Sequence, residues 1–172
     1  MLNTPSTDSR IWAAEVAAEA ALADPRCAAL FNVGNDPSVP DPQTLLAEMA
    51  SGLYGRAYMT FSDIGGPQNG TIANAQTSTT SYQAQPGFIV GFSGVSNNAV
   101  LTINTNPLAP FNSGTAVYDA TTLLHELGHV YEKLFGVGST FSVDDNTGNK
   151  KFDKLAGNFN NQIIQANCFL GG

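Results

Sequence analysis

The chain has 172 residues, of which 12% are charged, with a formal net charge of −7 and a pI near 4.5. Such an acidic surface, with no basic cluster to offset it, repels phosphate backbones and argues against a nucleic-acid partner. No apolar run approaches the roughly 20 residues that a membrane-spanning helix needs. The length suits one domain with its own hydrophobic core, and we expect residues 1–172 to form a single domain.

The first third of the chain has a helical composition. Alanine and glutamate dominate residues 9–24, and Pro25 ends or bends that run. Asp41 followed by proline is typical of a helix N-terminus and predicts a helix through about residue 50. Residues 1–52 are therefore expected to form an N-terminal helical part.

The middle of the chain changes to β-type sequence, and residues 53–105 are expected to form a small sheet. Later residues return to a helical pattern, with a last helix expected at about 151–166. Helices, then a sheet, then further helices indicate an α+β domain. Gly, Pro and Asn separate the short runs of the sheet, which occupy residues 54–61, 71–77, 87–92 and 99–104.

Residues 119–135 are predicted to form a helix with one apolar face. Asp119 is a suitable N-cap and Gly136 a suitable stop. Gly128 lies inside the helix and suggests a close approach by another element. The apolar stripe, at helical spacing, consists of Leu123, Leu127, Val130 and Leu134.

The chain has two histidines, and both lie in this helix, in the run His125-Glu-Leu-Gly-His129. Positions four apart share one face of a helix, so both imidazoles can reach a single metal ion. This face lies nearly opposite the apolar stripe, at about 100° per residue. Glu126, beside the first histidine, is placed to take a proton from a metal-activated water. The alternative is a pair of ordinary histidines on an amphipathic helix.

A zinc site needs a third protein ligand, and the chain has no third histidine. The downstream aspartates Asp144, Asp145 and Asp153 are the candidates, and we favour Asp144 or Asp145. A glycine-bearing run after the helix lets the chain turn back toward the site. The alternative is that the pair belongs to a polar turn. Glu132 lies too far along the helix to share the ion and is expected to orient an imidazole instead.

The motif and its flanks resemble the active-site helix of the zincin metallopeptidases, in the form whose third ligand is a carboxylate. The resemblance implies a twisted mixed sheet before an active-site helix at 119–135, and a third-ligand loop and terminal helix at 136–172. It implies Zn²⁺ bound by His125, His129 and Asp144 or Asp145, with Glu126 as general base in the hydrolysis of a protein or peptide substrate. In that family an edge strand binds the extended substrate, and we expect Ala99–Asn104 to be that strand; an ordinary interior strand is the alternative.

An oxyanion donor is also expected, and the candidates are Tyr82, Tyr118 and Tyr131.

A second interpretation of the same site is a non-catalytic, zinc-stabilised binding or adhesion module, and a third is a metal-free domain with a chance motif. The early cysteine and the ending Asn-Cys-Phe resemble metallopeptidase-like domains of large bacterial surface proteins. We therefore expect an extracellular or cell-surface location, as a domain of a larger exported protein.

The cysteines, Cys27 and Cys168, lie near opposite ends of the chain. In an oxidising compartment they can form a disulfide that joins the terminal helices. The alternative is two separate buried thiols. Both interpretations stay open on sequence alone.

Overall fold

The computed structural model describes residues 9–31, 36–62, 75–78, 98–104, 115–135, 145 and 148–169. Its elements follow the order helices, sheet, helices, which agrees with the α+β class. Their bounds are α1 Ser9–Leu22, α2 Pro25–Ala28, the 3₁₀ turn η1 Ala29–Phe31, α3 Pro42–Ser51, β1 Ala57–Ser62, β2 Ala75–Ser78, β3 Ala99–Asn104, α4 Ala116–Phe135 and α5 Lys150–Cys168.

Helices α1 and α3 lie close to their predicted bounds, whereas the short helix α2 was not predicted. Asp24 caps α2, accepting from the amide of Arg26, with proline in the first turn. Asp41 caps α3 in the same way, accepting from the amide of Thr44 at 3.0 Å. Gly52 ends α3 in the left-handed region, at φ 70°, which glycine adopts without steric cost.

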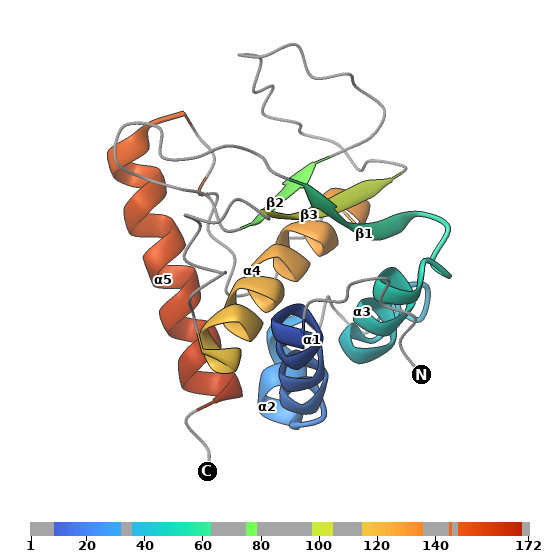
Figure 1. Cartoon of the computed structure of the whole chain (residues 1–172). Coiled ribbons are helices and arrows are strands. Elements are labelled where there is room, and N and C mark those ends of the chain that lie inside the picture. The colour runs from blue at the N-terminus through green and yellow to red at the C-terminus, as the bar shows by residue number, and fades with distance from the viewer. Residues whose placement is uncertain are drawn as a thin grey trace.

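Helix α4 lies at the centre of the molecule, with the sheet along one side and α1 and α5 on two others (Figure 1). Its whole predicted apolar stripe is buried, and Gly128 is buried with it. The core around α4 draws on α1, α3 and β3, where small residues such as Ala14 and Ala18 let α1 approach closely. The stripe therefore fixes which face of α4 turns away from the core.

Helix α4 begins earlier than predicted. Its first residue is Ala116, and Thr115 caps it by accepting from the amide of Tyr118 at 3.2 Å. Asp119 was expected as the N-cap, but it lies in the first turn, and its amide donates to the Thr115 carbonyl. Threonine and aspartate are both good caps, and here the upstream one is used.

The described sheet has three strands in the order β1-β3-β2. Strands β1 and β3 pair in parallel from Ala57↔Ala99 to Ser62↔Asn104, whereas β2 pairs with β3 antiparallel. The sheet is therefore mixed, as expected. The prediction of β3 as an edge strand is wrong for the described part of the sheet, because β3 lies between the other two strands. Burial of nearly every β3 residue agrees with a central strand.

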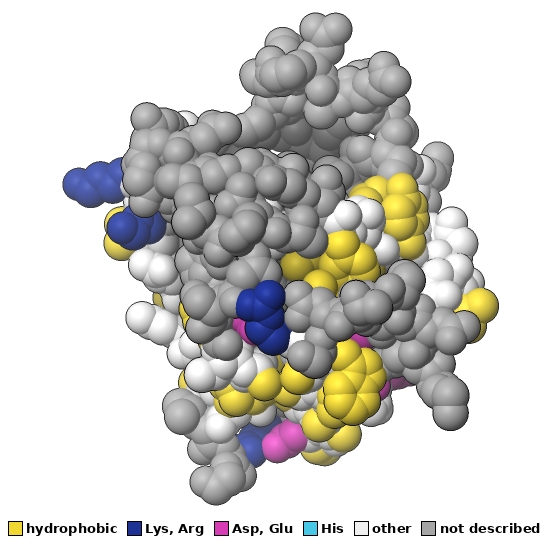
Figure 2. Space-filling view, in the orientation of Figure 1, with side chains coloured by type: hydrophobic (Ala, Val, Ile, Leu, Met, Phe, Trp, Pro, Cys, Tyr) yellow, Lys and Arg dark blue, Asp and Glu magenta, His cyan; other side chains and the backbone are white. Residues whose placement is uncertain are grey.

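Helix α5 packs against α4 and α2 with one narrow face. Ala156, Asn160 and Ile164 are buried there. The outer face leaves Phe152 and Leu155 exposed, and Figure 2 shows hydrophobic and basic side chains together over the N-terminal end of this helix. The helix thus buries only a few of its side chains, and its C-terminal end is also attached covalently.

That attachment is a disulfide between Cys27 in α2 and Cys168 at the end of α5, with a Cα–Cα distance of 4.6 Å. The sequence left two alternatives for the cysteines, a disulfide or two separate thiols, and the structure contains the disulfide. It closes a loop with a sequence separation of 141 residues. The C-terminal end of α5 is therefore fixed to the N-terminal helices.

Candidate metal centre

The site begins on α4, on the face opposite its buried stripe. His125 and His129 lie one helical turn apart, and their Nε2 atoms are 3.1 Å from each other. Their side chains are only 12% and 14% exposed. Glu126, between them in sequence, is buried. The two imidazoles therefore direct their free edges to one point in a poorly solvated region.

A third side chain reaches this point from outside the helix. Asp145 Oδ2 lies 2.7 Å from His125 Nε2, and Asp145 Oδ1 lies 3.0 Å from His129 Nε2. One donor atom from each of the three residues lies within 4.8 Å of the others. These residues form the His125–His129–Asp145 cluster, a group that can hold a metal ion.

The spacing of the cluster fits a small, tetrahedrally bound cation. Two nitrogens bound at 2.0–2.1 Å in tetrahedral geometry lie about 3.3 Å apart. The observed separations of 3.1, 2.7 and 3.0 Å are slightly shorter than this distance. A modest outward movement of side chains would therefore admit an ion without rearranging the backbone.

Each imidazole is also held on its other nitrogen. His125 Nδ1 donates to Asn161 Oδ1 at 2.8 Å, and His129 Nδ1 donates to Glu132 Oε2 at 3.1 Å. With a proton on Nδ1, each neutral ring keeps its Nε2 lone pair for a cation. Glu132 thus makes the orienting contact that its place on the helix predicts.

The approach of Asp145 depends on a glycine in α5. A Cβ atom built on Gly157 would lie 3.2 Å from Asp145 Oδ2 and 3.9 Å from His125 Cε1. The first distance is closer than ordinary van der Waals contact, so a larger residue would push the carboxylate. Helix α5 therefore packs its backbone directly against the cluster.

The cluster is strongly coupled electrostatically when it holds only protons. Burial alone would lower the pKa of His129, but hydrogen bonds to Asp145 and Glu132 raise it to about 10. For His125, too, burial acts to lower the pKa, and the hydrogen bond to Asp145 and the charge of Glu126 raise it above its usual value. Burial would raise the pKa of Asp145, yet the two histidines hold it well below its usual range. The carboxylates at the site thus favour bound positive charge, and protons on the histidines compete with a metal cation for it.

The predicted oxyanion donors are only partly placed. Tyr131 is fully buried, donates to the Pro40 carbonyl at 2.6 Å and packs on Phe31, so its hydroxyl is used in the core. Burial and the charge of Asp41 raise its pKa, which keeps the hydroxyl protonated. Tyr118 lies at the start of α4 and is 39% exposed. Tyr82 lies outside the described residues.

The three candidate aspartates have different outcomes. Asp145 joins the histidines, whereas Asp153, in the first turn of α5, does not belong to the cluster. Asp144 lies outside the described residues. Sequence reasoning missed Asn161 and Gly157, although their spacing of four residues places them on one face of α5. The spacing identifies these two residues as part of the site only once it is known which face of α5 lies toward the histidines.

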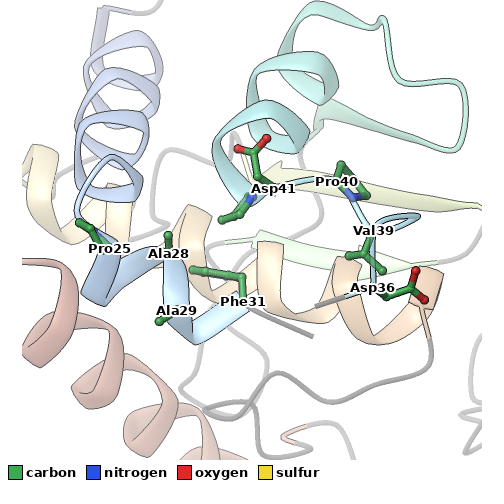
Figure 3. Close-up of a pocket in the computed structure, with 9 residues that line it drawn as sticks. Pro25, Ala28, Ala29, Phe31, Asp36, Val39, Pro40 and Asp41 are labelled. Carbon is green, nitrogen blue, oxygen red and sulfur yellow. The ribbon is translucent and has the colours of Figure 1, made fainter. Parts of the chain in front are cut away.

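A pocket of about 400 Å³ lies elsewhere, between α2 with η1 and the segment that leads into α3 (Figure 3). Its lining is mainly apolar, with Phe31, Val39 and Pro40 among its residues. Its two carboxylates already accept hydrogen bonds, Asp36 from Ser38 and Asp41 from Thr44. The pocket contains no member of the His125–His129–Asp145 cluster, and we assign it no chemistry.

Comparison of the chain with protein-family models, with curated proteins and with solved structures finds no match in any of the three. Among the described residues, no helix is both long and apolar enough to cross a membrane.

Proposed function

We propose that this chain is a zinc-dependent peptidase. The observation that carries the proposal is the convergence of two imidazole nitrogens and one carboxylate beside a buried glutamate. Structural zinc sites usually have four protein ligands, whereas catalytic sites have three and leave a position for water or substrate. Among the residues that the structure describes, the cluster offers three.

The donor set favours zinc over the hard cations. Mg²⁺ and Ca²⁺ prefer sites made of oxygen ligands, whereas two imidazoles and a carboxylate suit Zn²⁺. His125, His129 and Asp145 would hold the ion. When bound, zinc supplies a Lewis acid and lowers the pKa of coordinated water toward about 7.

Proton transfer is the role proposed for Glu126. It follows His125 directly on α4, it is buried, and its charge acts on both histidines. In the proposed reaction Glu126 accepts a proton from the attacking water and delivers it to the leaving amine. Asn161 and Glu132 hold the imidazoles in the orientation that the reaction requires.

A metal clamp without catalysis is the second candidate. Asp145 precedes α5 in sequence and contacts α4. An ion held by the cluster would therefore tie α5's leading segment to α4 and stabilise the fold, as in a binding or adhesion module. This candidate gives Glu126 no task, and for that reason we favour the peptidase.

The disulfide supports an exported location. Disulfides persist in oxidising environments, outside the cell or at its surface, and are rare in the reducing cytosol. A bond between Cys27 and Cys168 fits that setting. We therefore place this domain, as part of the same proposal, in an extracellular or cell-surface protein.

The decisive experiment measures metal content and turnover in three proteins: the parent, His129→Ala and Glu126→Gln. We expect one zinc per parent chain, loss of zinc in His129→Ala, and retained zinc without peptide hydrolysis in Glu126→Gln. Elemental analysis and a mixed-peptide cleavage assay measure the two properties. Zinc in the parent with equal hydrolysis by Glu126→Gln would overturn the proposed mechanism. Zinc without hydrolysis by the parent would favour the clamp.

A further inference from the structure

We infer that Asn161 is a positioning residue for the metal centre, acting through His125 from the C-terminal helix. The inference rests on the proposed function and extends it to an element that carries no ligand. Asn161 Oδ1 can only accept, so the 2.8 Å contact requires the proton on His125 Nδ1. The Nε2 lone pair of neutral His125 is then left for the ion.

The two histidines are supported differently. His129 donates to the carboxylate of Glu132 on its own helix, whereas His125 donates to a neutral amide on another helix. A carboxylate partner makes an imidazole more basic, but an amide fixes the ring without adding charge. Asp145 and Glu126 already bring negative charge to this region. Asn161 therefore supplies orientation alone.

Helix α5 is held firmly enough to transmit that orientation. Gly157, one turn before Asn161, lies against Asp145 and His125. Ile164 is buried three residues after Asn161, and Cys168 anchors the helix two turns after it. Asn161 thus lies between two contact points and cannot drift from His125 while α5 stays docked.

The test compares Zn²⁺ dissociation constants of the parent, Asn161→Leu, Asn161→Asp and Gln162→Leu. Asn161→Leu keeps the approximate size and removes the acceptor, and we expect affinity to fall by about 10- to 100-fold. Asn161→Asp keeps an acceptor and should bind zinc at least as tightly as the parent. Gln162→Leu makes the same type of replacement at the exposed neighbouring position and should leave affinity unchanged.

A spectroscopic readout separates positioning from a general structural effect. In ¹⁵N-labelled protein with zinc, His125 should show a protonated Nδ1 in the parent and in Asn161→Asp, and altered signals in Asn161→Leu. Unchanged affinity and unchanged signals in Asn161→Leu would overturn the inference while leaving the zinc site intact. A parent that binds no zinc would overturn the proposed function and this inference together.

Discussion

At the scale of single residues, Asp145 is the side chain that turns a histidine pair into a three-donor cluster. The carboxylate contacts both Nε2 atoms, one through each oxygen. It comes from outside α4, so no helical periodicity predicts it. The sequence limits the choice to three aspartates because acidic residues are few after the motif.

Replacing Asp145 by asparagine should weaken zinc binding more than loss of an outer hydrogen-bond partner does. We expect a decrease in affinity beyond about 100-fold, since the change removes the only anionic donor of the cluster. Isothermal titration with zinc measures it. Asp153→Asn is the matched control and should bind like the parent. Equal affinities for the two variants would contradict the assignment of Asp145.

His129 should make the metal-free domain less stable at alkaline pH. Its pKa is about 10 in the folded state and about 6.5 in the unfolded chain, so between these values the native state binds more protons. The stabilisation is complete below about pH 6.5 and is lost as the pH rises through about 10. Urea unfolding in chelator at several pH values measures the slope.

The matched comparison is His129→Gln, which cannot titrate. Subtracting the variant's curve from the parent's removes the contributions of lysines and tyrosines, which also titrate near pH 10. A parent-minus-variant difference in the free energy of unfolding that stays constant from pH 6.5 to 10 would show that His129 is not held by Asp145 and Glu132. In saturating zinc the alkaline loss should disappear, because a metal ligand is already deprotonated.

At the scale of elements, the sequence predicts the features that depend on neighbouring residues, such as helix starts and buried helix faces. Asp41 and the following proline begin α3, and the apolar stripe of α4 is buried throughout. The strand Ala99–Asn104 is placed correctly, but its position within the sheet is not. Strand order depends on pairing between distant segments, which alternation of side chains along one strand does not encode.

The same limit applies to α5. Its existence follows from its composition, but its rotation about its own axis is set by packing on α4 and by the disulfide. The face that carries Gly157 and Asn161 is polar and small, and it has no hydrophobic period to reveal it. The histidines and Glu126 were therefore predictable, whereas the supporting helix face was not.

Replacing Gly157 by alanine should separate helix stability from metal binding. Alanine in a helix interior adds about 0.5–1 kcal/mol of stability relative to glycine. The new Cβ would press on Asp145 Oδ2, so we expect zinc affinity to fall by about tenfold, as for other disturbed supporting contacts. Thermal unfolding without metal and zinc titration measure the two effects.

Asn158→Ala is the control for that experiment. Asn158 is exposed in the same turn of α5, and its replacement by alanine raises the helix propensity. It should stabilise the domain and bind zinc like the parent. If Gly157→Ala binds zinc as tightly as Asn158→Ala does, Asp145 has room to move, and the close packing at Gly157 does not affect zinc binding.

At the scale of the whole molecule, the disulfide is the largest single constraint on the chain. Closing a loop with a separation of 141 residues contributes about 5 kcal/mol in the chain-entropy treatment. The double variant Cys27→Ser, Cys168→Ser should lose a large part of this, as measured by urea unfolding. Zinc affinity should fall as well, because α5 then holds Asn161 and Gly157 less firmly.

Reductant supplies the control for that prediction. It should shift the unfolding midpoint of the parent toward that of the double variant and leave the double variant itself unchanged. A parent whose midpoint does not respond to complete reduction would show that α5 docks equally well without the covalent bond.

The same bond has a mechanical consequence. If the domain is pulled from its two ends, tension passes through Cys27–Cys168 and bypasses α3, the sheet, α4 and the His125–His129–Asp145 cluster. Within this sequence the loaded path then runs through residues 1–27 and 168–172, so tension would reach α4 only through its packing against α1 and α5. Reduction would bring the enclosed segment under load, and its unfolding would release a further length on the order of 480 Å, at about 3.4 Å per extended residue. For a domain at a cell surface, the bond would keep the His125–His129–Asp145 cluster out of the direct line of an applied force.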